Sequence, residues 1–202
     1  QDSAANTEVY VDGRDDNAAD GGTIANIGSV ANALALNVGA EAGGTANFFD
    51  GKLDEIRIYD RALSPEEIGN LNRLSTPTGT DTGLVGYWSM NGQDTSATIA
   101  YDRSGASNDG TLTNGPTKAI GKLGQALNFD GTNDYVNAGS AAIIDNLTNL
   151  SACAWVNPDT IPSGYTTVIS QMDNGGAEVT FGFHDNGTAD YLELYRSFST
   201  TI

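Results

Sequence analysis

The chain is poor in the residues that build disulfides, zinc sites and membrane spans. It has one cysteine (Cys153) and one histidine (His184) among 202 residues. A lone cysteine excludes a disulfide within the chain, and a lone histidine is too little for a zinc site, which takes several Cys or His ligands. No apolar run approaches the roughly 18 residues of a membrane-spanning helix. We therefore expect no membrane insertion, no zinc and no disulfide scaffold.

Basic residues are also scarce. The 26 acidic and nine basic residues give a formal net charge of −17. A field of this sign repels phosphate backbones and anionic lipid head groups, so nucleic acids and membrane surfaces are poor partners. The same field attracts divalent cations.

What the chain does have is glycine and short β-rich segments. It contains 25 glycines, 39% apolar residues and 17% charged residues. Short apolar segments alternate with Asp, Asn and Gly turns at a spacing of about ten residues, which is typical of a β-sandwich. The sequence predicts an all-β jelly-roll sandwich of two antiparallel sheets.

One short helix is expected near residues 65–71. Ser64 is a good N-cap, Pro65 suits the first helical position, and Glu67 completes a capping box. Long helical periodicity is absent elsewhere in the sequence.

Two copies of one turn pattern stand out, at residues 49–56 and 129–136. Each reads Phe-Asp-Gly, two free positions, Asp, one free position and an aliphatic residue that opens a strand. Asp-Gly favours a turn, because Gly tolerates positive φ and Asp bonds its own downstream backbone. Each copy therefore indicates a turn that leads into a strand, with carboxylates at the start of that strand.

The strand after the first copy alternates between Leu53 and Tyr59. Strict alternation puts Asp54 on the same face as Ile56 and Ile58. A carboxylate on an inward face is costly without a partner, so we expect one. The opposite face would carry Leu53, Glu55, Arg57 and Tyr59.

Six segments match a known family in motif and spacing. They are Gly83–Met90, Asp102–Leu112, Gly124–Gly131, Ser151–Pro158, Glu8–Gly13 and Phe49–Tyr59. Together they resemble the laminin-G-like jelly-roll modules of the concanavalin A-like lectin/glucanase group. Their order is permuted, because the segments that close such a module come first here. We expect residues 1–72 to be the C-terminal part of one module, 73–82 a linker and 83–202 the N-terminal part of another, as in a window from a tandem array.

The resemblance includes glucanases, so catalysis needs a separate argument. Retaining glucanases need paired carboxylates on one strand face, roughly 5 Å apart. The nearest pair here is Asp54 and Glu55, whose carboxylates strict alternation places on opposite faces. We therefore expect no enzymatic activity.

Calcium is the cofactor that the resemblance implies. In related glucanases an Asp of the last strand binds a structural calcium with main-chain oxygens near the first strand, and Asp54 is the matching residue. Asn91 and Asp130 are its expected companions, since calcium takes six to eight mixed oxygen ligands. The alternative is that these residues only cap turns.

Sugar binding is the function that the resemblance implies. The aromatic residues expected in loops or at edges, where they could contact a glycan, are Tyr101, Tyr165 and Tyr195. Trp88 and Trp155 are expected in the core. We predict a non-catalytic module of a secreted or cell-surface repeat protein that binds a glycan or another cell-surface ligand in adhesion.

Two alternatives stay open at this point. The first is a structural repeat that binds neighbouring copies and polymerises into an extracellular filament by strand or domain exchange. The second is a glucanase-type hydrolase.

Overall fold

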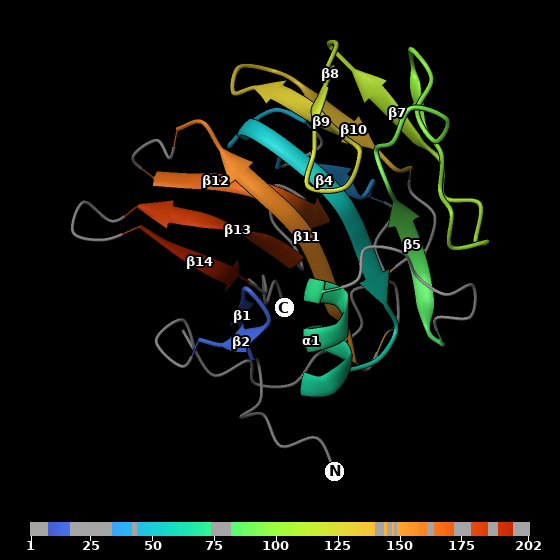
Figure 1. Cartoon of the computed structure of the whole chain (residues 1–202). Helices are drawn as coiled ribbons and strands as arrows, with labels where there is room; N and C mark the ends of the chain where they lie inside the picture. The colour runs from blue at the N-terminus through green and yellow to red at the C-terminus, as the bar shows by residue number, and fades with distance from the viewer. Residues whose placement is uncertain are drawn as a thin grey trace, which may run out of the picture.

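Two antiparallel β-sheets pack face to face in the computed structural model (Figure 1). The structure describes residues 8–16, 34–41, 44–73, 82–139, 144, 147, 149–160, 164–171, 179–185 and 190–195, with the backbone alone from 184 onwards. The all-β sandwich predicted from the sequence is confirmed.

The first sheet has seven strands. Their order across the sheet is β14 (Asp190–Tyr195), β13 (Val179–Asp185), β12 (Gly164–Gln171), β3 (Asn37–Val38), β10 (Tyr135–Asn137), β7 (Gly110–Thr113) and β6 (Ile99–Ala100). A separate small hairpin consists of β1 (Tyr10–Val11) and β2 (Arg14–Asp15).

The second sheet is built around one long strand, β4 (Asp50–Tyr59). The strands of this sheet are β11 (Ser151–Pro158), β4, β9 (Gln125–Asp130) and β8 (Thr117–Ile120), with β5 (Leu84–Trp88) also paired to β4. Strand β11 runs along one edge of β4, whereas β9 and β5 share its other edge. The strand β4 is therefore enclosed on both sides.

Strands from the start of the chain lie between strands that come after residue 83. Strand β3 pairs with β10 and β12, and β4 pairs with β5, β9 and β11. In this structure the two segments thus complete one sandwich within a single chain. The division at 1–72, 73–82 and 83–202 as parts of two modules stays a prediction.

The helix α1 (Pro65–Arg73) begins as its capping residues predict. The Ser64 amide donates to Glu67 Oε2 at 2.8 Å, and the Glu67 amide donates to Ser64 Oγ at 3.3 Å. The helix extends two residues beyond the expected end at 71.

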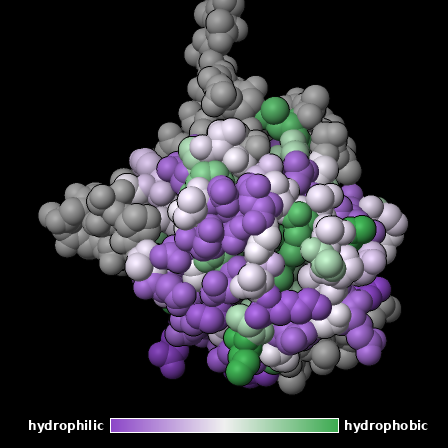
Figure 2. All heavy atoms as spheres, turned by 90° about the horizontal axis from the view of Figure 1, so that it is seen from above, coloured by the Kyte–Doolittle hydropathy of each residue, from purple (hydrophilic) through white to green (hydrophobic). Residues whose placement is uncertain are grey.

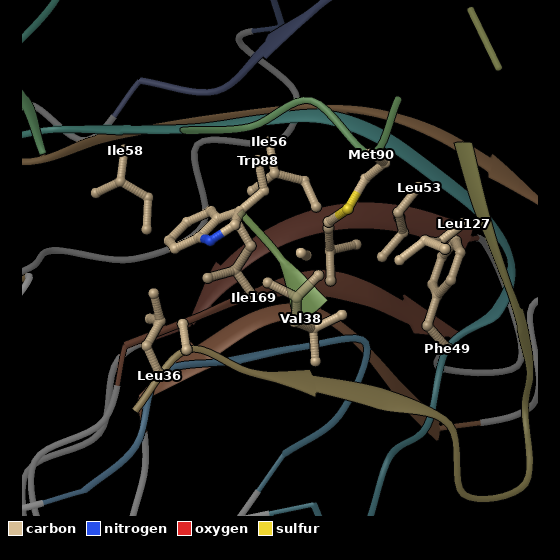
Figure 3. Close-up of a cluster of buried hydrophobic side chains, with 14 of the residues drawn as sticks. Leu36, Val38, Phe49, Leu53, Ile56, Ile58, Trp88, Met90, Leu127 and Ile169 are labelled. Carbon is tan, nitrogen blue, oxygen red and sulfur yellow. The ribbon is translucent and has the colours of Figure 1, made fainter. Parts of the chain in front are cut away.

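The apolar core lies between the two sheets (Figure 3). Leu53, Ile56 and Ile58 of β4 project into it together, opposite Val38 and Ile169 of the other sheet. Strict alternation in β4 was therefore the wrong prediction, because Leu53 shares a face with Ile56 and Ile58.

A β-bulge explains this change of phase. Between the pairs Arg57–Cys153 and Asp54–Trp155, β4 has two residues where β11 has one. Glu55 adopts a φ of 54° there, which is unusual for a residue other than glycine. The extra residue returns Ile56 to the core face and leaves both Asp54 and Glu55 off it.

The two tryptophans differ in position. Trp88 is in the core, as predicted, and its indole N–H donates to the Asn108 carbonyl at 3.0 Å. Trp155 is only half-buried and lies outside the core, because its neighbours Ala154 and Val156 take the inward positions of β11. The prediction that Trp155 is a core residue is therefore wrong.

Candidate functional site

A row of polar residues crosses the outer face of the seven-stranded sheet. Five neighbouring strands contribute one residue each, and the pairing register sets them side by side. In order from β13 to β7 they are Thr180, Ser170, Asn37, Asn137 and Thr111. We call this set the polar row.

Alternation along each strand places the polar row on the face away from the core. Asn37 lies between the core residues Leu36 and Val38, and Asn137 lies between the core residues Val136 and Ala138. Because successive side chains in a strand point to opposite faces, both asparagines face outward. The same pattern could have indicated them in the sequence, but the two-residue strand β3 is too short to recognise there.

One end of the polar row is buried and the other is open. Asn37 and Ser170 are fully buried, whereas Asn137 is half-buried and Thr111 is exposed. Ser170 Oγ donates to the Ala40 carbonyl at 3.2 Å. The row therefore runs from a buried end to a solvent-exposed end.

Several buried polar atoms on this face have no hydrogen-bond partner. They include Asn37 Oδ1 and Thr180 Oγ1 of the polar row, together with Thr167 Oγ1 of β12 on the same face. A buried polar atom without a partner costs about 1–3 kcal/mol. Such atoms are therefore suited to bind ordered water, whereas a ligand can reach only the accessible members of the row.

The three predicted tyrosines separate in the structure. Tyr165 is 47% exposed and lies on the same outer face as the polar row, about 17 Å along β12 from Ser170. Tyr195 is opposite Thr180 in the register, and its side chain lies outside the described residues. Tyr101 follows β6 at the far edge of the sheet, about 19 Å from β12, with the Arg103 guanidinium 5.8 Å from its ring centre. The structure thus places Tyr165 on this face and the backbone of Tyr195 next to the polar row. Tyr101 lies away from both.

Hydrophobic residues form small separate spots on the surface seen in Figure 2, among larger hydrophilic areas. The large apolar side chains exposed on the described residues are Val11, Ile120 and Tyr165. An aromatic residue near polar groups is typical of sugar sites, so Tyr165 is the one of these three residues that could contact a sugar.

Two of the predicted metal ligands meet at the turn between β8 and β9. Asp54 Oδ2 accepts from the Leu123 amide, and Asn91 Oδ1 accepts from the Gln125 amide, each at 2.9 Å. A Cβ on Gly121 would come within 2.5 Å of Asp54 Oδ2, so the carboxylate needs glycine there. Both side chains therefore hold this turn against the sheet.

Asp54 is the electrostatically unusual member of the pair. It is 2% exposed, and Oδ1 has no hydrogen-bond partner. Burial raises the pKa of the Asp54 carboxyl above its ordinary value, and the Leu123 amide acts in the opposite direction. A cation near Oδ1 would compensate the burial of this charge.

Asp130 does not join this group. In the register it faces Asp50. Asp50 lies four residues from Asp54 along β4, a distance of about 13 Å. Its Oδ1 accepts from the Thr132 amide at 2.8 Å and from the Asn133 amide at 3.2 Å, which is the capping role of the alternative reading. In the described part of the chain, no group of three or more His, Cys, Asp or Glu residues is placed to hold a metal ion. The residues present fit a calcium ion only if Asp54 and backbone or Asn91 oxygens supply its ligands.

A buried ion pair lies on the outer side of the second sheet. Glu55 and Arg57 are each 2% exposed and form a close ion pair, and the Tyr87 hydroxyl donates to Glu55 Oε2 at 2.9 Å. The Arg57 guanidinium also lies 4.6 Å from the centre of the Tyr87 ring. Burial raises the pKa of Glu55, against the attraction of Arg57. We call Glu55, Arg57 and Tyr87 the ionic cluster.

The bulge also changes the argument about catalysis. Asp54 and Glu55 both lie off the core face, so the prediction that their carboxylates point to opposite faces is wrong. They interact, because the Asp54 charge contributes to the raised pKa of Glu55. Both side chains are nevertheless buried, and Glu55 is engaged with Arg57 and Tyr87. A polysaccharide therefore has no direct access to this pair.

The helices of the described residues are too short or too polar to cross a membrane. This finding agrees with the absence of long apolar runs in the sequence.

Comparison with known proteins gives one match, in the first third of the chain. Residues 2–69 match a laminin-G family model, described as the concanavalin A-like lectin/glucanases superfamily, and residues 70–202 lie outside the match. Neither a curated protein nor a solved structure matched the chain. Laminin-G-like modules are generally non-catalytic and typically extracellular, and the family suggests carbohydrate binding or adhesion. The resemblance found in the sequence is thus confirmed on residues 2–69, which are similar to the concanavalin A-like lectin/glucanases superfamily.

Proposed function

We propose that this chain is a non-catalytic, glycan-binding module of a secreted or cell-surface repeat protein. The observation that carries the proposal is the polar row, which has unpartnered buried atoms at one end and exposed groups at the other. The family match and the strongly acidic composition agree with it, because a neutral sugar is a suitable partner for a protein that repels anions.

The geometry assigns different roles to the two ends of the polar row. Asn137 and Thr111 are accessible and would hydrogen-bond sugar hydroxyls directly. The buried Asn37 and Ser170 are out of reach of a sugar, and their packing would hold the neighbouring strands rigid, so that the accessible groups bind with little loss of entropy. Tyr165 offers an aromatic ring on the same face, within the length of an extended oligosaccharide. Adhesion would follow from binding sugars on a neighbouring surface.

Calcium binding at Asp54 accompanies this proposal as a structural device. Asp54 and Asn91 would hold the ion with backbone oxygens around the turn of residues 121–124. The ion would neutralise the buried carboxylate and fix this turn against β4. Asp130 has no part in this site.

The alternative function, a structural repeat that polymerises, is favoured by one observation. Strands β3 and β4 from the start of the chain complete sheets made by strands from its later part. Such strands could equally complete a neighbouring copy.

A glycan array followed by calorimetry on the best ligand tests the main proposal. The double substitution Thr111→Ala with Asn137→Ala should weaken binding by about fivefold to a hundredfold, because two hydrogen bonds of about 0.5–1.5 kcal/mol each are lost. The matched control is Thr117→Ala, an exposed threonine of β8 in the other sheet, which should leave affinity unchanged.

Three outcomes would contradict the proposal: no glycan bound on the array, equal affinity of the double variant and the unmodified protein, or hydrolysis of β-glucan. The last result would favour the glucanase alternative.

A further inference from the structure

We propose that residues 8–73 act as an exchangeable donor segment, which one copy of this chain inserts into the sandwich of a second copy. The remaining residues from 82 onwards are the acceptor. The proposal concerns assembly and does not depend on sugar binding.

The pairing of strands separates the chain into these two parts. Within the described donor residues, strand pairing is limited to the β1–β2 hairpin and an isolated bridge between Glu41 and Ala46. The long strand β4 and the strand β3 pair only with acceptor strands. The donor therefore acquires its sheet structure from the acceptor.

The acceptor without its donor would contain two open slots. Between β11 and the edge shared by β5 and β9 it lacks β4, and between β10 and β12 it lacks β3. It would also lose Leu53, Ile56 and Ile58 from the core. Exposed strand edges and an uncovered apolar face favour association with a strand that fits them.

The fit is specific for the donor sequence, so a strand that enters the slots from outside must be the donor of a second copy. The donor Glu55 carboxylate receives the acceptor Tyr87 hydroxyl, and the donor Asp54 carboxylate receives the acceptor Leu123 amide. At Gly51, with a φ of 135°, any Cβ would collide with the Asn157 carbonyl of the acceptor. A strand of unrelated sequence meets neither the charges nor this close approach.

The connection between the two parts can accommodate either arrangement. The donor ends with α1 at Arg73, and the acceptor begins beside Arg61, whose Nε donates to the Thr82 carbonyl at 2.7 Å. Helix α1 is about 13 Å long, and the connection must span at least this length to return from Arg73 to Thr82. Nine residue steps from 73 to 82 reach about 30 Å when extended, so the connection is long enough. The same donor–acceptor contacts form whether the two parts belong to one copy or to two. Reciprocal exchange would give a closed pair, and one-way exchange a growing chain.

Complementation between two defective full-length chains tests the exchange. Ile56→Asp damages the donor alone, and Leu127→Asp damages the acceptor alone, since both side chains are fully buried in the core. Each variant by itself should lose the near-ultraviolet circular dichroism of the packed sandwich. Refolded together from urea, they should recover up to half of it, because the intact donor of the Leu127→Asp chain fits the intact acceptor of the Ile56→Asp chain, while the other donor and acceptor stay damaged. Light scattering should then show the mass of two chains.

The controls make the result decisive. Ile120→Asp, at an 88% exposed position of β8, should keep the native signal alone. A chain with both Ile56→Asp and Leu127→Asp should not restore the Ile56→Asp variant, because neither chain then has an intact donor. A mixture that equals the sum of its two separate samples would overturn the proposal, and so would recovery with the doubly substituted chain. Either result would leave the glycan proposal untouched.

Discussion

The polar row and the ionic cluster treat buried polarity in opposite ways. On the seven-stranded sheet, the polar row contains neutral groups, and Asn37 Oδ1 and Thr180 Oγ1 have no partner. On the second sheet, the ionic cluster pairs Glu55 with Arg57 and Tyr87. The first arrangement leaves buried hydrogen-bonding atoms without partners, whereas the second pairs its charges with each other. The ionic cluster therefore stabilises the fold, whereas the polar row lies on the face that we propose for ligand binding.

Breaking the ionic cluster should give the largest effect on stability. Arg57→Ala leaves the Glu55 carboxylate buried without its cation, so the free energy of unfolding should fall by about 3–5 kcal/mol. Urea unfolding measures this change. The matched control is Arg103→Ala, which removes the more exposed ion pair with Asp94 and should cost under about 1 kcal/mol. Equal losses in the free energy of unfolding would show that the ionic cluster contributes no more to stability than an exposed ion pair.

Calcium should act next, through Asp54. A ligand that binds only the folded protein adds about 2.7 kcal/mol to its stability at a hundredfold excess over Kd. The melting temperature should therefore rise with calcium and fall with chelator, and Asp54→Asn should abolish the difference. Asp130→Asn should retain it, because Asp130 caps a separate turn. An unchanged melting temperature in calcium and in chelator would refute the metal site.

The pH dependence of stability should reveal the same carboxylate without metal. Because burial raises the pKa of Asp54, the folded protein holds a proton more tightly than the unfolded chain. The stability from this group is complete below the ordinary Asp pKa and is lost as pH rises through the raised value. In chelator, Asp54→Asn should therefore be more stable than the unmodified protein at pH 7, and this advantage should vanish toward pH 3. A difference that stays constant with pH would contradict this account.

The smallest effect should come from the polar row. Thr180→Val removes the unpartnered Oγ1 at nearly constant volume, so the free energy of unfolding should rise by up to about 1 kcal/mol. Ser170→Ala should lower it by about 1 kcal/mol, because Ser170 Oγ donates to the Ala40 carbonyl. Thermal unfolding of both variants tests the contrast. Losses of equal size would mean that Thr180 Oγ1 has a partner in solution.

Local chemistry made part of this structure predictable. The cap at Ser64 and Glu67, the Asp-Gly turns and the rhythm of short strands all follow from interactions between near neighbours in sequence. The same holds for Asp130, whose turn-capping alternative was visible in the sequence. These features need no knowledge of what packs against them.

The bulge at Glu55 was not predictable from the sequence. Nothing in the residues 53–57 favours a positive φ, since Glu prefers other conformations. The bulge exists because β4 must pack Leu53 and Ile56 into one core while it pairs with strands on both edges. This one extra residue determines on which face of β4 the side chains of Asp54, Glu55 and Leu53 lie. The polar row was hidden for a similar reason, because its residues come from five strands that only the fold brings together.

The enclosed position of β4 has a consequence for proteolysis. A protease that cuts between residues 73 and 82 would break the covalent link between donor and acceptor, while β4 would stay paired with β11 on one edge and with β5 and β9 on the other. The two pieces would separate on a denaturing gel and migrate as one species under native conditions. A nick at this place would therefore leave an intact two-chain protein.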